Sequence, residues 1–218
     1  MAVTAGGGHS PRANESRHQI MGRRSDHSRD ELRALILDAG IALIAEKGFA
    51  AFSAREVAKR IGYTIGTIHN VFGNVDGLLT AINTATFAAW ADTLTASLDA
   101  ANDDRIAALV AGYFAFARDN PHRWAAIYDH RPACETLTGE QEATRGRLMV
   151  IVAAEIARAL DRPVDTALGT FARSLVATVH GHCSFAITGS WAAMGQHDPE
   201  QVALARVRES LAAERGRH

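Results

Sequence analysis

The sequence predicts an all-α fold from three observations. Ala is abundant, aromatic residues make up 6% of the chain, and there are only 5 Pro in 218 residues. This composition suits helices, because Ala is the best helix former and Pro the worst. Apolar residues recur three and four positions apart, the period of a helix that packs one face on a core. A chain of this length can hold a small domain packed on a larger one.

The first predicted helix begins near Ser28 and ends at Gly48. Ser28 and Glu31 have the spacing of a capping box, in which each side chain bonds a backbone N–H group of the other residue. Phe49 and Phe52 are expected to complete the core of this part. The helix carries an apolar stripe made of Leu32, Leu35, Ile36, Ala39, Leu43 and Ile44.

The stretch 53–72, SAREVAKRIGYTIGTIHNVF, predicts two short helices with a tight turn between them. Ser53 and Glu56 repeat the capping-box spacing at the start of the first helix. Gly62 follows that helix at once, as expected of a residue that adopts positive φ at a helix end.

The second short helix opens at Thr64, and its Ile68 and Phe72 share one apolar face. Two helices joined by a Gly-containing turn, the second with a polar outer surface, are typical of a helix-turn-helix that reads DNA. The side chains left pointing outward from this helix are Thr67, His69 and Asn70.

The rest of the chain reads as further helices. Gly73 breaks the chain, and Asn74 is placed to cap a long helix over 75–98 that links the two parts. A loop holding Trp191 is expected between two glycines at 189 and 195. The other helices are predicted over 104–119, 122–130, 139–160, 164–187 and 199–214.

Two segments carry a family resemblance. GTIHNVFGNVDGLL (66–79) resembles the TetR-type pattern of Gly-Thr-Ile-Tyr, two residues, Phe, a short turn and an acidic-Leu-Leu helix start. ILDAGIALIAEKGFAAFSAREVAKRIG (36–62) resembles the first two helices of the same family. The resemblance covers residues 29–89. It implies an all-helical TetR/AcrR-type regulator, a homodimer that binds pseudo-palindromic operator DNA and releases it when a small molecule binds.

The resemblance also suggests a division of the chain. Residues 1–27, rich in Gly, Ser, Arg and His, are expected to be a disordered arm. Residues 28–89 would be the helix-turn-helix domain, and residues 90–218 the ligand-binding and dimerisation domain. Within the latter, FARDNPHRWAAIYD and SLVATVHGHCSFAI resemble TetR regulators named for a Trp-His-Gly signature. His180-Gly181 matches the signature, whereas Val176 stands about where its Trp would fall.

Candidate DNA contacts follow from the resemblance. Arg55 matches the second-helix Arg that can reach a guanine edge; the alternative is a solvated helix Arg. Asn70 could pair with adenine, and Thr67 could touch a thymine methyl group or a phosphate. Tyr63 and Thr64 lie at the turn and could meet the DNA backbone.

Two departures from the family pattern bear on DNA binding, and the loss of a Lys weakens phosphate binding. His69 stands where the family usually has Tyr, and Val75 stands where it usually has Lys, a phosphate anchor. Residues that could compensate are Arg23, Arg24, Lys59 and Arg60. A helical dimer that has lost DNA binding is therefore kept as the alternative function.

Aromatic and polar residues of the C-terminal part are candidates for an effector pocket, since large apolar pockets occur between the helices of bundles. At helical spacing they fit a packed core equally well. The candidates are Trp90, Tyr113, Phe116, Trp124, Tyr128, Phe171 and His182, with Phe87 and Met149 nearby.

A homodimer is expected on the last two predicted helices, paired as a four-helix bundle. The helix over 164–187 is apolar nearly all round, which indicates burial or an interface. The apolar residues assigned to this interface are Leu168, Phe171, Leu175, Val179, Phe185, Val202, Ala205 and Leu211.

Other classes of protein fit the sequence poorly. There is no HExxH, Gly-rich phosphate loop or GxSxG pattern, so we expect no enzyme and no cofactor. His180 and His182 lie about 200° apart on a helix, so they cannot chelate one metal ion. Cys134 and Cys183 lack CxxC spacing, which favours a reduced, cytoplasmic protein. No apolar run is long enough to span a membrane.

Charge is close to balanced. The net charge is −1; residues 1–82 carry ten Lys or Arg against eight Asp or Glu, and the remainder carries thirteen against sixteen. This mild asymmetry would not by itself suggest a nucleic-acid partner.

Overall fold

The computed structural model describes residues 1–2, 27–131 and 137–217, and this part of the chain is helical without a strand. The all-α prediction is therefore confirmed, while Arg23, Arg24 and Cys134 lie outside the described residues. The elements are α1 (Arg29–Lys47), the 3-10 turn η1 (Phe49–Ala51), α2 (Ala54–Arg60), α3 (Ile65–Phe72), α4 (Val75–Asp99), α5 (Arg105–Asp119), α6 (Pro121–Asp129), α7 (Gly139–Leu160), α8 (Thr166–Ile187), α9 (Ser190–Ala193) and α10 (Pro199–Arg215).

Helix boundaries follow local capping chemistry. Ser28 Oγ accepts from the Glu31 N–H at 3.3 Å and Glu31 Oε2 accepts from the Ser28 N–H at 2.8 Å, so the predicted capping box is present. Asn74 Oδ1 accepts from the N–H of Gly77 at 2.7 Å and begins α4 as predicted.

The second predicted capping box is only half formed. Ser53 Oγ accepts from the Glu56 N–H at 3.4 Å, but the Glu56 carboxylate does not return to the backbone of Ser53. It binds Lys47 Nζ at 2.7 Å and Arg60 at 3.1 Å instead. Two cations therefore outcompete one backbone N–H group for this carboxylate.

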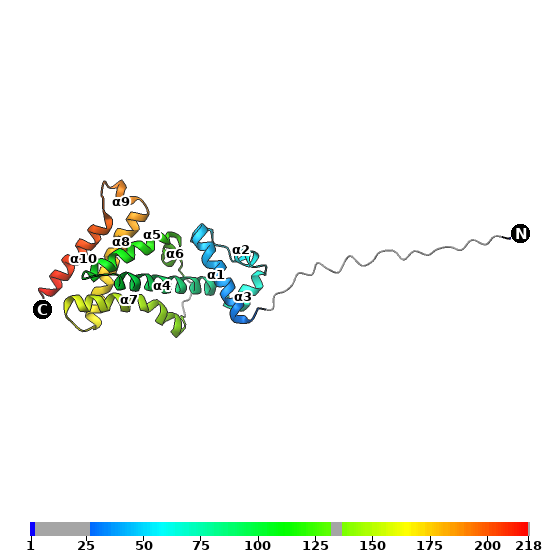
Figure 1. Ribbon diagram of the computed structural model, residues 1–218, viewed down its shortest axis with the longest axis horizontal. Coiled ribbons are helices and arrows are strands. Elements are labelled where there is room, and N and C mark those ends of the chain that lie inside the picture. The colour runs from blue at the N-terminus through cyan, green and yellow to red at the C-terminus, as the bar shows by residue number, and fades with distance from the viewer. Residues whose placement is uncertain (3–26, 132–136, 218) are drawn as a thin grey trace.

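Figure 1 shows two lobes, here called the head (η1, α1–α3 and the start of α4) and the body (the rest of α4 and α5–α10). The head closes around its own buried cluster, in which Phe49 and Phe52 are partly buried as expected. Burying each large aliphatic side chain stabilises the fold by about 1.5–3 kcal/mol. The fully buried members of this cluster include Ile36, Leu43, Ile44, Val57, Ile68, Leu78 and Ile82.

Helix α4 runs through both lobes (Figure 1). Its first turns bury Leu78 and Ile82 in the head, and its last turns bury Trp90, Leu94 and Leu98 in the body. A single helix thus belongs to two cores, which fixes the head on the body.

Two features of the body refine the prediction. Only one face of α8 is buried, carrying Leu168, Leu175 and Val179 inside this chain, where α8 packs on α10. Burial within one chain therefore covers one face of this helix, and the interface alternative stays a prediction. The expected loop around Trp191 contains a one-turn helix, α9, which lies at the tip of the body.

No described helix is long and apolar enough to cross a membrane. The described residues also contain no cluster of metal-ligating side chains.

Candidate DNA-binding surface and effector cavity

The helix-turn-helix geometry is built by α2 and α3. Gly62 has φ 76° as predicted, and the N–H of Tyr63 donates to the carbonyl of Ala58 at 2.9 Å, which ends α2. Ile68 of α3 is fully buried, so the opposite side of that helix faces solvent. The two helices pack on each other.

The residues predicted to contact DNA lie on α2, on α3 and in the turn between them. Arg55 and Lys59 are exposed one turn apart on α2, and neither forms an ion pair with a described residue. Thr64, His69 and Asn70 are exposed, whereas Thr67 and Tyr63 are half-buried. The surface therefore offers two cations from α2 and amide, imidazole and hydroxyl groups from α3.

Arg60 is not free to bind phosphate as the sequence suggested. Its guanidinium holds both carboxylate oxygens of Glu46, at 2.8 and 2.7 Å, and also contacts Glu56. The hydrogen bonds from Arg60 lower the pKa of Glu46 below its usual range, and those from Lys47 and then Arg60 do the same for the pKa of Glu56. Of the two basic residues that end α2, Lys59 is the one left available.

Two contacts in the head involve residues that the sequence did not single out. The Arg33 guanidinium of α1 lies 4.6 Å from the ring centroid of Phe72, a cation–π contact that joins α1 to α3. On α6, His122 donates its Nδ1–H to the carbonyl of Ala45 at 2.8 Å, which satisfies an end carbonyl of α1.

A buried polar cluster also joins α6 to the head. His130 Nδ1 accepts from the Asn83 side-chain amide at 3.3 Å, and His130 Nε2 lies 3.5 Å from a carboxylate oxygen of Asp76. The Phe49 ring packs beside His130, with the ring centroids 5.9 Å apart. Helix α6 is therefore the element of the body that meets α1, η1 and the start of α4 together.

The predicted effector residues form stacks. Trp90 stacks on Phe116 with the ring centroids 5.3 Å apart and meets Tyr113 edge-on at 4.7 Å. Such pairs each contribute about 0.5–1.5 kcal/mol beyond area burial. Trp124 meets Tyr128 edge-on, with the ring centroids 5.4 Å apart. These contacts favour the alternative reading, in which most of these aromatics are core.

His180 lies at the centre of these stacks. Its Nδ1 lies 2.9 Å from the Tyr113 hydroxyl, within hydrogen-bond distance, and its ring centroid lies 4.2 Å from that of Tyr128 and 4.9 Å from that of Trp124. Burial lowers the pKa of His180, which favours the neutral ring that can accept from Tyr113. In the sequence, His180 stood out because His180-Gly181 matches the His-Gly of the Trp-His-Gly signature.

Phe171 and His182 lie apart from that cluster. Phe171 is half-buried against the body core. His182 donates its Nδ1–H to the carbonyl of Thr178 at 2.8 Å and packs against Trp191.

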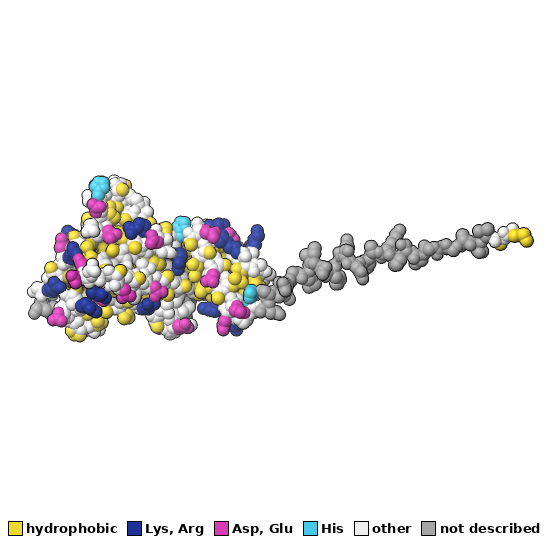
Figure 2. All heavy atoms as spheres, viewed as in Figure 1, with side chains coloured by type: hydrophobic (Ala, Val, Ile, Leu, Met, Phe, Trp, Pro, Cys, Tyr) yellow, Lys and Arg dark blue, Asp and Glu magenta, His cyan; other side chains and the backbone are white. Residues whose placement is uncertain are grey.

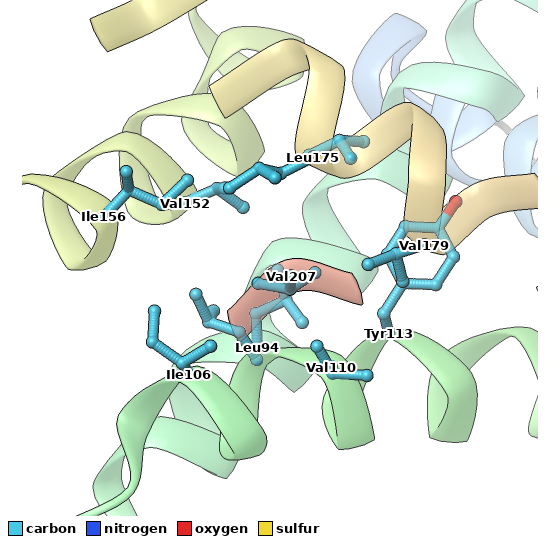
Figure 3. Close-up of a pocket in the computed structure, with 11 residues that line it drawn as sticks. Leu94, Ile106, Val110, Tyr113, Val152, Ile156, Leu175, Val179 and Val207 are labelled. Atoms are coloured by element: carbon cyan, nitrogen blue, oxygen red, sulfur yellow. The ribbon is translucent and has the colours of Figure 1, made fainter. Parts of the chain in front are cut away.

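A small cavity of about 40 Å³ lies in the body between α4, α5, α7, α8 and α10. Figure 3 shows side chains from these helices pointing into it. Of the seven predicted effector residues, Tyr113 alone is in its lining; the other lining side chains are Leu94, Ile106, Leu109, Val110, Val152, Ile156, Leu175, Val176, Val179 and Val207.

Comparison with known proteins places both lobes in one family. The description "Bacterial regulatory proteins, tetR family" matches residues 36–82, and "Tetracyclin repressor-like, C-terminal domain" matches residues 106–209. The chain belongs to the TetR family. Its helix-turn-helix lies within the first matched segment, and the cavity is lined largely by the second.

Individual relatives of this TetR-family chain are distant. It is 28% identical over 116 residues to the HTH-type transcriptional regulator Rv1816 of Mycobacterium tuberculosis, an alignment that covers 50% of this chain. The chain spans about half, 47%, of the length of that curated relative.

Solved structures share the fold. The putative regulatory protein SCO4313 aligns with a TM-score of 0.66 at 24% identity, over 84% of this chain and 97% of that one. The multidrug binding protein EbrR complexed with imidazole aligns with a TM-score of 0.58 at 22% identity, over 85% and 96%. The finer resemblance to the Trp-His-Gly type stays a prediction.

Proposed function

We propose that this TetR-family protein is a transcriptional regulator that binds operator DNA as a homodimer. The observation that carries the proposal is the α2–turn–α3 unit, which buries Ile68 and leaves Arg55, His69 and Asn70 exposed. A helix held in this way can enter a major groove with its polar side outward. Membership of the TetR family supports this reading.

Each exposed group has a chemical role in this proposal. Arg55 reads guanine through its two-pronged guanidinium, and Asn70 reads adenine through its amide. Lys59 binds phosphate. The remaining contacts, to the DNA backbone and to thymine methyl groups, come from Tyr63, Thr64, Thr67 and His69.

Dimerisation through α8 and α10 is part of the proposal, but its surface differs from the one first expected. Leu168, Leu175, Val179 and Leu211 are buried inside one chain and cannot face a partner. The exposed apolar residues that remain near this face are Phe185, Ile187 and Met194. Pairing these helices with those of a second copy would cover them.

We further propose that the regulator is a repressor that a small molecule releases from DNA. The cavity between the body helices supports an effector site, and α6 supports a connection from body to head. The relative EbrR is described as multidrug binding and was solved with imidazole. Such release is allosteric only if the effector favours one of two conformations.

Selection of bound fragments from random DNA tests the proposal. We expect a pseudo-palindromic site bound by a dimer, which sedimentation at micromolar concentration would also detect. Replacing His69 and Asn70 together by Ala should abolish the selected footprint while leaving the helical circular dichroism unchanged. A stable dimer that protects no DNA of operator length would instead support the alternative, a helical interaction protein without DNA binding.

A further inference from the structure

The side chains that line the cavity are chemically uniform, and this indicates which kind of effector could bind there. Ten of its eleven lining side chains are aliphatic, and the other is Tyr113. Figure 3 shows these side chains converging from opposite walls. The lining contains no carboxylate, ammonium or guanidinium group.

Two polar side chains beside the cavity, Tyr113 and His180, favour their uncharged forms as well. The Tyr113 hydroxyl lies 2.9 Å from His180 Nδ1 and 3.5 Å from the Tyr128 hydroxyl, within hydrogen-bond distance of both. Burial raises the pKa of Tyr113 and lowers the pKa of His180, so both shifts favour uncharged side chains near neutral pH. A charged ligand would find no counter-ion here, and burying an unpaired charge is strongly unfavourable.

We propose that this cavity binds an uncharged, mainly aliphatic molecule. The inference rests on the proposed regulatory function, because it names the chemical class of that function's effector. The larger groove lined by Arg118, Asp198 and Glu200 is a poorer match to such a molecule, since it presents charged groups.

The size of the cavity links binding to a conformational change. A volume of about 40 Å³ is far below the 300–1,000 Å³ of typical ligand pockets. A molecule of ten or so heavy atoms therefore binds only after the walls separate. Its affinity for the two conformations then differs by necessity, which is the condition for shifting an equilibrium.

The position of Tyr113 gives that change a route to the head. Separation of the walls displaces Tyr113, whose hydroxyl lies 2.9 Å from His180 Nδ1, and the ring of His180 packs on Tyr128 and Trp124 of α6. Helix α6 in turn holds the end of α1 through His122. Expansion of the cavity therefore acts on the element that joins body to head.

The test uses three ten-carbon probes on the full chain at pH 7.5: decan-1-ol, decanoate and decylammonium. Calorimetry and thermal unfolding would measure binding, since a ligand selective for the folded chain raises the melting temperature. We expect decan-1-ol to bind, and the two ions to bind at least roughly 30-fold more weakly because their charges are unpaired. Equal affinity for the alcohol and either ion overturns the proposed class.

A matched pair of variants on α7 locates the site. Val152 lines the cavity, whereas Val150 of the same helix is 68% exposed. V152F should lower the affinity for decan-1-ol at least tenfold, and V150F should leave it unchanged. If V152F does not fold, V176L adds a smaller group to the same cavity. Unchanged binding in V152F or, where that variant fails to fold, in V176L overturns the location.

DNA binding separates this inference from the function on which it rests. On a selected operator, decan-1-ol should release the wild type and V150F but not the variant whose cavity is filled. Operator binding without any binding of decan-1-ol overturns the effector class and leaves the regulator intact. Binding of decan-1-ol that depends on Val152, in a chain that binds no operator, supports the cavity and contradicts the function.

Discussion

Arg55 lies exposed on α2 without an acidic partner among the described residues, unlike Arg60 on the same helix. We expect Arg55→Ala to lower specific operator affinity by about 1–3 kcal/mol, the worth of one two-pronged base contact. Circular dichroism and dimer mass should not change. Arg118→Ala, at a 66%-exposed arginine of the body, is the control and should bind as the wild type does. Equal affinities for all three proteins would remove Arg55 from the reading surface.

Glu155 is a buried carboxylate whose negative charge is stabilised by an arginine. Arg105 donates to its two oxygens at 2.6 and 2.7 Å, and these hydrogen bonds lower the pKa of Glu155 below its ordinary value of 4.5. A lowered folded-state pKa stabilises the fold above the unfolded pKa, and this contribution is lost as the pH falls through the folded value.

Urea unfolding across a pH series would measure this contribution. We expect Glu155→Gln to be less stable than the wild type at pH 7, with the difference shrinking as the pH falls below about 4.5. Glu209→Gln, which alters a 57%-exposed carboxylate paired with Arg206, should show almost no difference at any pH. A pH-independent difference for Glu155→Gln would mean that packing rather than charge is lost.

At the scale of the element, the start of α4 depends on a glycine. A Cβ atom at Gly77 would lie 2.1 Å from the backbone oxygen of Phe72, so the junction of α3 and α4 would have to shift. Gly77→Ala should destabilise the fold by about 1–3 kcal/mol, as overpacking does.

Gly146 in α7 provides the matched control for that substitution. A Cβ atom there meets no other atom within 4 Å, so Ala should stabilise the helix by about 0.5–1 kcal/mol. In urea unfolding, we expect the free energy of unfolding to fall for Gly77→Ala and to rise for Gly146→Ala. A neutral Gly77→Ala would show that the α3–α4 junction can shift at little cost.

The sequence predicted the long helices closely because their signals are local. The box at Ser28 and the cap at Asn74 involve residues three apart, and the spacing alone specifies them. The capping box predicted at Ser53 is only half formed, because Lys47 binds the Glu56 carboxylate. Lys47 lies six residues before Ser53, in another helix. Helix α9 was missed because one turn carries no periodicity.

The candidate sites were predictable to different degrees for the same physical reason. Residues such as His69 and Asn70 lie on a face that buried Ile68 defines within the same helix. The effector cavity is lined by five helices, so no spacing within one segment could separate Tyr113, which lines it, from Trp90, which meets Tyr113 edge-on but is not in the lining.

For the whole molecule, Lys, Arg, Asp and Glu side chains are interspersed over both lobes on the face in Figure 2. Operator affinity should therefore depend on a few specific cations. In a dimer, Lys59→Ala removes two phosphate contacts and should lower the slope of log affinity against log salt by about 1.8. Arg60→Ala should leave the slope unchanged, because Glu46 and Glu56 already hold that side chain. Equal decreases would show that the Arg60 ion pairs open on DNA.

The continuity of α4 has a mechanical consequence. Its 25 residues form an uninterrupted rod of about 37 Å, anchored in the body at Trp90 and Leu94 and in the head at Leu78 and Ile82. A tilt of only about 5° at one end displaces the other by about 3 Å, close to the ~3.4 Å rise of one base pair. Movements too small to expose either core would thus suffice to bring the two heads of a dimer out of register with successive grooves.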